Sequence, residues 1–272
     1  MATPIGNLRD ISMRALDILH AADVVLCEDT RVTQKLLSVF GLHKKLERCD
    51  EHMEKRRIAE TVTNIRNGQI YAFVSDAGTP GISDPGALLV NGCREAGIFI
   101  SPVPGASAVV SAVSVAGLAP ATAFTFLGFL PVKSGARRKI FQDWRDMPTA
   151  LVLYEAPQRV AATLEDIAAI MGQRTVMIAR ELTKLHETTY VGTPDILTEQ
   201  IATDSFRGEV VMVIHPQTGQ DNTLWTDEKI DAALQGLLQD NSLKQAVAMV
   251  TAQSGLSRKI VYARALMLER NA

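Results

Sequence analysis

Short continuous runs of apolar residues alternate with helix-type patterns along the first part of this chain. The runs at 24–27, 69–74 and 98–100 predict strands, because they are short, apolar and bounded by turn residues. Apolar residues spaced three and four apart around these runs predict helices, at 11–22, 33–40, 54–67, 87–96 and 107–116. Strands that alternate with helices predict an α/β fold with a mostly parallel sheet, covered on both faces.

The pattern changes after Pro120, where strand-type runs become more frequent. They predict five strands, at 124–130, 151–154, 175–179, 188–191 and 209–214, with helices at 136–145, 158–171 and 194–202. This set of elements predicts an α+β domain with a mixed sheet.

A polar, turn-rich segment at 217–222 predicts a linker to a separate tail. Beyond it, two helices at 244–252 and 258–268 flank a glycine-containing turn, an arrangement that resembles a helix-turn-helix. We therefore expect three parts, at 1–120, 121–216 and 217–272.

Composition narrows the class of protein. The 272 residues carry a net charge of −2, which excludes an overall basic nucleic-acid-binding protein but allows local basic patches. The three cysteines have no metal-type spacing and are odd in number, so neither a disulfide framework nor a zinc site is expected. The chain shows no secretory signal and no apolar stretch of membrane-spanning length, and we expect a cytoplasmic protein without a membrane partner.

The segment 74–86 is the strongest indication of chemistry. It ends an apolar run with three glycines, two prolines and two aspartates, and so places carboxylates and free backbone amides at the carboxyl end of a strand. Ligands bind at that edge in open α/β sheets. A tight turn whose aspartates cap the next helix is the simpler interpretation. Similar segments at 3–7, 102–107 and 154–159 favour a single shared site.

These segments, taken together, resemble the tetrapyrrole-methylase-like class of S-adenosylmethionine methyltransferases. Within that class the chain is similar to the bacterial branch that methylates the ribose 2′-oxygen of a decoding-centre cytidine in 16S ribosomal RNA. The motifs that carry the resemblance cover nearly the whole chain, at 3–8, 28–31, 75–80, 104–105, 128–131, 154–159, 179–184 and 208–209. The family normally has an apolar strand before the motif at 3–8, so we expect that first strand to be missing or a stub here.

The resemblance implies which residues bind the cofactor, S-adenosylmethionine, in a site between the first two domains. They are Asp76, Ala77, Gly78, Thr79, Ser107, Ala108, Tyr154, Ala179, Gly208 and Val210. A ribose hydroxyl is a poor nucleophile and needs a base or strong polarisation. Candidates are Glu155, Lys184, Glu181 and Asp29, the last in a pair with Glu28. Glu181 and Lys184, three residues apart, are equally consistent with a surface ion pair.

Ribosomal RNA requires cationic surface, and the chain has cations in two regions. We expect RNA contacts from Arg31, Lys133, Arg137, Arg138, Lys139 and Arg159. The tail, 241–272, has five cations against Glu269, although a solvated helix face explains that pattern as well. The resemblance also implies a homodimer, for which the small-residue helix at 107–116 offers apolar surface.

Two other functions fit part of the pattern, and a third is possible only in principle. A tetrapyrrole methyltransferase has the same fold, and fold does not fix substrate. A non-enzymatic nucleic-acid-binding regulator would use the tail, but it leaves the glycine-rich turns unexplained. A dinucleotide enzyme lacks support because no G-x-G-x-x-G follows a strand.

Overall fold

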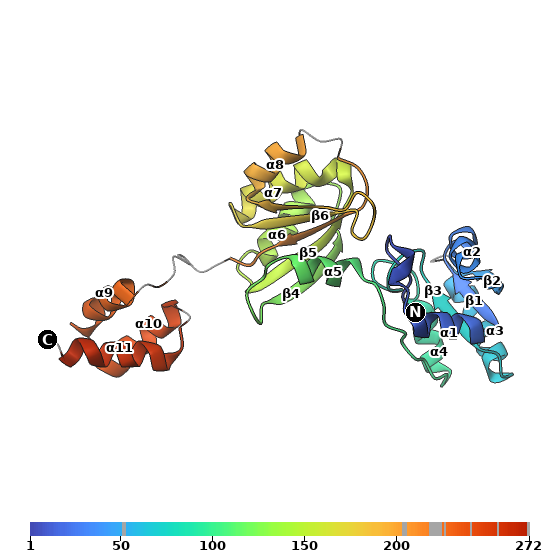
Figure 1. Ribbon diagram of the computed structural model, residues 1–272, viewed down its shortest axis with the longest axis horizontal. Coiled ribbons are helices and arrows are strands. Elements are labelled where there is room, and N and C mark those ends of the chain that lie inside the picture. The colour runs from blue at the N-terminus through green and yellow to red at the C-terminus, as the bar shows by residue number, and fades with distance from the viewer. Residues whose placement is uncertain are drawn as a thin grey trace. The chain divides into compact units, whose positions relative to one another are not determined.

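The computed structural model describes residues 1–50, 53–202, 206–217, 225, 227–239, 241–254 and 256–270 (Figure 1). The chain forms two compact units, Met1–Pro216 and Gln217–Ala272. The first unit holds both sheets, and the second holds three helices. Most of the predicted linker at 217–222 lies outside the described residues.

The first sheet has three parallel strands in the order β2-β1-β3. The central strand, β1 (Val24–Cys27), is wholly buried and pairs with β2 (Lys45–Arg48) and β3 (Tyr71–Val74). The sequence pattern missed β2, because this edge strand has three charged residues out of four. The helices of this part are η1 (Leu8–Asp10), α1 (Met13–Ala21), α2 (Thr30–Val39), α3 (Glu54–Arg66), α4 (Ala87–Glu95) and α5 (Ala108–Val115).

Side-chain caps explain where several of these helices begin. The Ser12 hydroxyl accepts a hydrogen bond from the backbone N–H of Ala15 at the start of α1. Ser107 does the same for Val110 at the start of α5, over 3.5 Å. Each cap satisfies a backbone donor that a helix leaves without an internal partner.

The strand predicted at 98–100 is wrong. The N–H of Ile98 donates to the Cys93 carbonyl and so closes the end of α4. Phe99 is 89% exposed, and no described strand pairs with this segment. An apolar run alone therefore does not make a strand, because the backbone groups need a neighbouring strand to bond.

The second sheet is mixed, as predicted, with the strand order β4-β5-β8-β6-β7. The parallel pair is β4 (Ala123–Phe129) with β5 (Thr149–Glu155). The other pairings are antiparallel: β5 with β8 (Val210–Ile214), β8 with β6 (Val176–Arg180), and β6 with β7 (Thr188–Gly192). The helices are α6 (Ser134–Trp144), η2 (Pro157–Arg159), α7 (Val160–Met171) and α8 (Pro194–Ala202). One hydrophobic cluster packs α6, α7 and α8 on this sheet, and a second packs α5 on it.

A buried ion pair joins α6 to α7. The Arg137 guanidinium lies 2.5 Å from the carboxylate of Asp166, and the two residues are 3% and 2% exposed. Arg137 also donates to the carbonyls of Val132 and Ala162, while Ser134 and Arg138 donate to Asp166. Arg137 was predicted to contact RNA. In the structure Arg137 is instead buried and paired with Asp166, so Arg137 is not retained among the RNA-binding candidates.

The second unit consists of α9 (Asp227–Leu238), α10 (Leu243–Ser254) and α11 (Arg258–Arg270). Its core includes Leu234, Val247 and Val261. Arg264 on α11 bonds to Asp227 and Asp231 on α9 and so ties these two helices together. The helices α10 and α11 match the predicted pair, whereas α9 was not predicted. None of the described helices of the chain is both long enough and apolar enough to span a membrane.

Replacing Arg137 should strongly destabilise the first unit. In Arg137→Met, the buried carboxylate of Asp166 loses one of its two cations. We expect the free energy of unfolding to fall by about 3–5 kcal/mol, the usual cost of breaking a buried pair. Urea unfolding measures this change, with the exposed Lys139→Met on the same helix as a control.

The double variant Arg137→Met, Asp166→Leu should recover much of the loss, because both buried charges are removed. Burial opposes ionisation of Asp166, but Arg138, Ser134 and Arg137 outweigh it and lower the pKa of Asp166 from its usual 3.8. The pair therefore stabilises the fold above that pH, and its contribution is lost as the pH falls. Equal stability of wild type and Arg137→Met at neutral pH would contradict the assignment.

Candidate functional site

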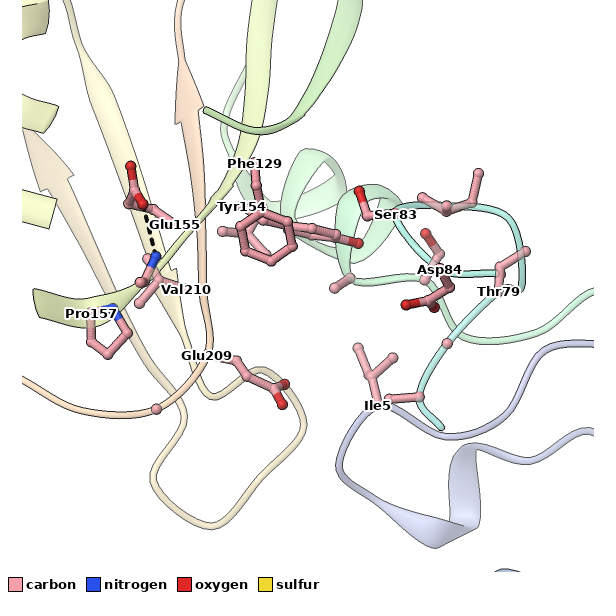
Figure 2. Close-up of a pocket in the computed structure, with 18 residues that line it drawn as sticks. Ile5, Thr79, Ser83, Asp84, Phe129, Tyr154, Glu155, Pro157, Glu209 and Val210 are labelled. Carbon is pink, nitrogen blue, oxygen red and sulfur yellow. Dashed lines mark hydrogen bonds between the residues drawn. The ribbon is translucent and has the colours of Figure 1, made fainter. Parts of the chain in front are cut away.

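A cavity of about 320 Å³ lies where loops of both sheets meet in the first unit. Figure 2 shows Ile5, Thr79, Ser83 and Asp84 on one wall and Tyr154 with Phe129 on the facing wall. We call it the main cavity. Its 18 lining residues are Ile5, 77–79, 82–84, Ser107, Ala108, Phe129, 154–157 and 208–211.

The loop after β3 forms one wall through its backbone. Thr3 and Gly78 pair as an antiparallel bridge, with N–H to oxygen distances of 2.9 and 3.0 Å. Gly78 has a φ of +77°, and a Cβ there would lie 3.2 Å from the Ile5 side chain. The Thr79 hydroxyl donates to the Ala106 carbonyl over 3.1 Å and so joins this loop to the start of α5. Glycine therefore meets both requirements here, the backbone angle and the close approach.

Aromatic rings form the facing wall. The ring centroid of Tyr154 lies 5.0 Å from that of Phe126 and 5.4 Å from that of Phe129. Burial raises the pKa of Tyr154, and the nearby Asp84 and Glu209 raise it further. The phenol therefore stays neutral at physiological pH and can donate a hydrogen bond. Phe129 remains largely exposed and offers a ring face to a flat ligand.

Asp84 belongs to the walls of two cavities. Besides the main cavity, it lines a neighbouring space of about 520 Å³ together with Ser83. We call this second space the acidic cavity, because its lining contains four carboxylates, namely Glu28, Asp50, Glu54 and Asp84. Burial raises the pKa of Asp84, which a hydrogen bond from Ser75 opposes and the charge of Asp76 reinforces.

Glu155 lies at the end of β5 and was predicted as a catalytic residue. It contributes to the main cavity, but its carboxylate is fully engaged in the fold. One oxygen accepts from the Thr163 hydroxyl over 2.7 Å, and the other accepts from the Ala156 N–H over 2.9 Å. Arg159 forms an ion pair with it over 3.1 Å and donates to the Leu130 carbonyl. Glu155 thus fixes the turn from β5 into α7.

Glu181 and Lys184 form an ion pair of 2.8 Å beside the cavity rather than in its lining. The Glu181 carboxylate also accepts from the Glu209 N–H over 2.8 Å, and Lys184 lies 3.1 Å from the Glu209 carboxylate. Lys184 lowers the pKa of Glu181. Burial works against the charge of Lys184, but the two carboxylates outweigh it and raise its pKa. Lys184 is therefore held protonated, which disfavours it as a base.

Asp29 and Asp76 connect the carboxyl ends of β1 and β3. The Asp29 N–H donates to the Asp76 carboxylate over 3.1 Å, and the Asp29 carboxylate binds Arg31. Hydrogen bonds from Arg31 strongly lower the pKa of Asp29, so it stays ionised and is a weak base. Asp76 lines a separate space under α2, not the main cavity, and burial raises its pKa.

The main cavity includes most of the residues expected to bind cofactor: Ala77, Gly78, Thr79, Ser107, Ala108, Tyr154, Gly208 and Val210. Asp76 and Ala179 are not among its lining residues. Ala179 is 1% exposed in the hydrophobic cluster beneath α5, so it cannot contact a ligand and is not retained as a binding candidate.

Of the remaining RNA-binding candidates, Lys133, Lys139 and Arg31 are exposed. Arg31 pairs with Asp29, while Arg138 is half exposed and bound to Asp166. Arg159 is held by Glu155 and the Leu130 carbonyl. The exposed cations at the start of α6 and along it that have no ion-pair partner among the described residues are therefore chiefly Lys133 and Lys139.

Several lining residues were not predicted: Ile5, Ser83, Asp84, Phe129 and Glu209. All of them lie within or beside the segments that carry the resemblance, so their motifs were visible in the sequence. Their orientation was not, because it depends on contacts between loops far apart in the chain. No group of three or more His, Cys, Asp or Glu in the described part of the chain is arranged to hold a metal ion.

A family model described as tetrapyrrole (corrin/porphyrin) methylases matches residues 2–197, and one described as the RsmI C-terminal HTH domain matches residues 226–269. Solved structures of the same fold include a uroporphyrin-III-C-methyltransferase from Thermus thermophilus, with a TM-score of 0.55, 19% identity and coverage of 79% of this chain and 91% of that one. A diphthine synthase has a TM-score of 0.61 at 15% identity and covers 80% of this chain and 88% of its own.

Curated relatives named ribosomal RNA small subunit methyltransferase I are much more similar. The protein from Neisseria meningitidis serogroup A is 42% identical over 98% of this chain and 91% of its own length. Those from Xylella fastidiosa and Escherichia coli O157:H7 are 43% and 40% identical, over 96% and 97% of this chain and 96% and 92% of their own lengths. The chain therefore belongs to the tetrapyrrole methylase family, whose cofactor is S-adenosylmethionine, and within it to the group of ribosomal RNA small subunit methyltransferase I proteins.

Proposed function

We propose that this protein methylates 16S ribosomal RNA, transferring a methyl group from S-adenosylmethionine to the ribose 2′-hydroxyl of a cytidine in the decoding centre. The observation that carries the proposal is the main cavity, most of whose lining lies within residues 2–197 that match the tetrapyrrole methylase model. The names of the relatives, at about 40% identity over nearly full length, support ribosomal RNA as the substrate. Since ribosomes assemble in the cytoplasm, we expect the protein there.

The residues of the main cavity fit the cofactor. The bound molecule supplies an electrophilic methyl group on a sulfonium. Its flat adenine requires apolar and aromatic surface, which Phe129, Val210 and Ile82 offer. Its amino acid end requires backbone donors and acceptors, which the loop around Gly78 presents without a Cβ. The carboxylates of Asp84 and Glu209 favour its positive charge.

Asp84 is the best placed proton acceptor for the 2′-hydroxyl. It lies on the wall between the main and acidic cavities, and burial raises its pKa toward the range in which a carboxylate accepts a proton well. The earlier candidates are less suited, because Glu155 is saturated with hydrogen bonds and Lys184 is held protonated. Asp29 is bound by Arg31. We therefore propose that Asp84 orients the hydroxyl and takes its proton.

The isosteric variant Asp84→Asn should lower kcat by about 10²–10⁴-fold, the usual contribution of a positioned base. Transfer of labelled methyl to small ribosomal subunits that lack the modification measures kcat, and calorimetry with S-adenosylmethionine measures cofactor affinity. We expect affinity to fall much less than kcat, because an amide retains the shape of the side chain and Glu209 remains to favour the positive charge of the cofactor. The control Asp143→Asn, at an exposed position of α6, should leave both values unchanged. An unchanged kcat in Asp84→Asn would remove Asp84 from the reaction.

RNA binding is expected to use Lys133 and Lys139 together with Arg31. Lys133 lies at the N-cap position of α6 and Lys139 lies within it, close in sequence to the end of β4 that carries Phe129. The second unit adds the exposed cations Arg258 and Lys259 at the start of α11. Cations at these positions can bind phosphates without reading sequence.

The double variant Lys133→Glu, Lys139→Glu reverses two charges and should weaken binding to small subunits by about tenfold or more at low salt. It should also lessen the dependence of affinity on salt concentration. Cofactor affinity should not change, because neither residue lines the main cavity. Filter binding over a salt series measures both effects. Equal loss of RNA and cofactor binding would indicate misfolding, and an unchanged salt dependence would exclude this surface.

We also propose a homodimer. Helix α5 exposes Val110 and Val115, each 58% exposed, on the side away from the second sheet. Sedimentation equilibrium should give twice the chain mass, and Val110→Asp with Val115→Asp should shift it toward the monomer because two buried charges oppose association. A monomeric wild-type protein would exclude the dimer.

A further inference from the structure

The acidic cavity is not explained by cofactor binding. It lies between the end of β1 and the start of α4, and its lining consists of Glu28, Asp50, Glu54 and residues 83–88. We propose that it holds the base of the nucleotide being methylated, and that Glu54 and Glu28 accept hydrogen bonds from the exocyclic amino group of cytosine. This inference rests on the proposed function and identifies the residues that select its substrate.

Glu54 provides the strongest indication of a ligand. It is 2% exposed at the first turn of α3, and one carboxylate oxygen accepts from the Leu88 N–H over 3.3 Å. The other oxygen, Oε1, is buried and has no hydrogen-bond partner in the described part of the chain. A buried carboxylate oxygen in this state is costly unless a donor reaches it. Because Glu54 lines the acidic cavity, an occupant of that cavity can supply the donor.

Glu28 points to the same kind of occupant. It is partly buried at the end of β1 and has no hydrogen-bond or ion-pair partner among the described residues. Burial raises the pKa of Glu28, and the charges of Asp76, Asp84, Asp50 and Asp29 raise it further. A site of this kind disfavours added negative charge and favours a group that donates hydrogen bonds.

The shared wall identifies which part of the substrate enters. Ser83 and Asp84 line both cavities, so an occupant of the acidic cavity lies beside the reacting ribose. Figure 2 shows both residues on the wall opposite Tyr154. Enzymes that act on one nucleotide commonly hold its base in a separate pocket and recognise its hydrogen-bonding edge. The base attached to the target ribose is thus the occupant within reach.

Cations outside the acidic cavity allow a polyanionic RNA to place a base among these carboxylates. Arg48 lies 2.8 Å from Asp50, and Arg31 pairs with Asp29 next to Glu28. Both guanidinium groups are largely exposed, with 68% and 85% of the side chain accessible. They can bind the phosphates on either side of the inserted base, while the carboxylates remain for the base itself.

Carboxylates at the base edge distinguish cytosine from uracil. Cytosine has an amino group at position 4 that donates hydrogen bonds, whereas uracil has a carbonyl oxygen that would face the carboxylate oxygens. Sites built to hydrogen-bond a substrate amino group can reject an analogue that lacks it by large factors. We therefore expect wild-type protein to prefer cytidine at the target position by about 100-fold or more in kcat/KM.

The test uses small ribosomal subunits reconstituted with either cytidine or uridine at the mapped target position. Glu54→Gln and Glu28→Gln keep side-chain size, and a glutamine amide can both donate and accept. Each should reduce the preference in kcat/KM at least tenfold, with part of the change coming from faster methylation of uridine. Glu60→Gln, on the same helix α3 and exposed, is the matched control and should retain the full preference.

The outcomes separate the two levels of the proposal. Wild-type protein that methylates neither subunit would contradict the proposed function itself. Equal methylation of cytidine and uridine by wild-type protein would overturn the base pocket while leaving the function intact. Wild-type preference that persists unchanged in both glutamine variants would also overturn it. The ratio of kcat/KM for the two subunits does not depend on the fraction of active protein. Calorimetry with S-adenosylmethionine and thermal unfolding are therefore needed to identify a variant that has lost its fold.

Discussion

The backbone pairing of Thr3 with Gly78 is the contact on which the main cavity depends. Thr3 is buried, and its hydroxyl also donates to the Ser75 carbonyl over 3.1 Å, so the first residues of the chain are fixed to the loop after β3. The pairing brings Ile5 against Gly78. The pairing of Thr3 with Gly78 thus determines the shape of this wall of the main cavity. It also sets the direction of the residues that follow Thr3.

The following residue extends this constraint to the second sheet. A Cβ on Gly6 would lie 2.5 Å from the Lys184 side chain and 2.7 Å from the Thr183 hydroxyl, and the Asn7 N–H donates to that hydroxyl over 3.1 Å. Thr183 has a φ of +66°, an uncommon conformation for a β-branched residue. Strain of this kind persists where surrounding contacts fix the backbone. The close approach of Gly6 and the hydrogen bond of Asn7 therefore fix the first loop of the chain against the loop that follows β6.

Much of this organisation is readable from sequence, and the exceptions have physical causes. Strands such as β1 and β8 are continuous apolar runs because both faces are buried, which makes them easy to predict. Edge strand β2 has only Leu46 as an apolar residue and was missed. In the site, the glycine-rich motifs marked the correct loops, but the role of each carboxylate depends on partners distant in sequence. Glu155 ends a strand, and Asp29 and Asp84 lie in loops after strands, yet of the three only Asp84 faces both cavities.

The carboxylates around the two cavities are sorted by their environment. Asp29 and Glu181 have cationic partners that lower the pKa of each, so they remain ionised and stabilise loops. Asp84 and Glu28 have no cationic partner among the residues that the structure describes, and burial raises the pKa of each. A carboxylate paired with a cation is already stabilised in its ionised form. A carboxylate surrounded by other acids is stabilised most by a hydrogen-bond donor or by taking up a proton. The same sequence motif can therefore supply structural anchors and reactive groups, and the difference lies in which side chains the fold places beside them.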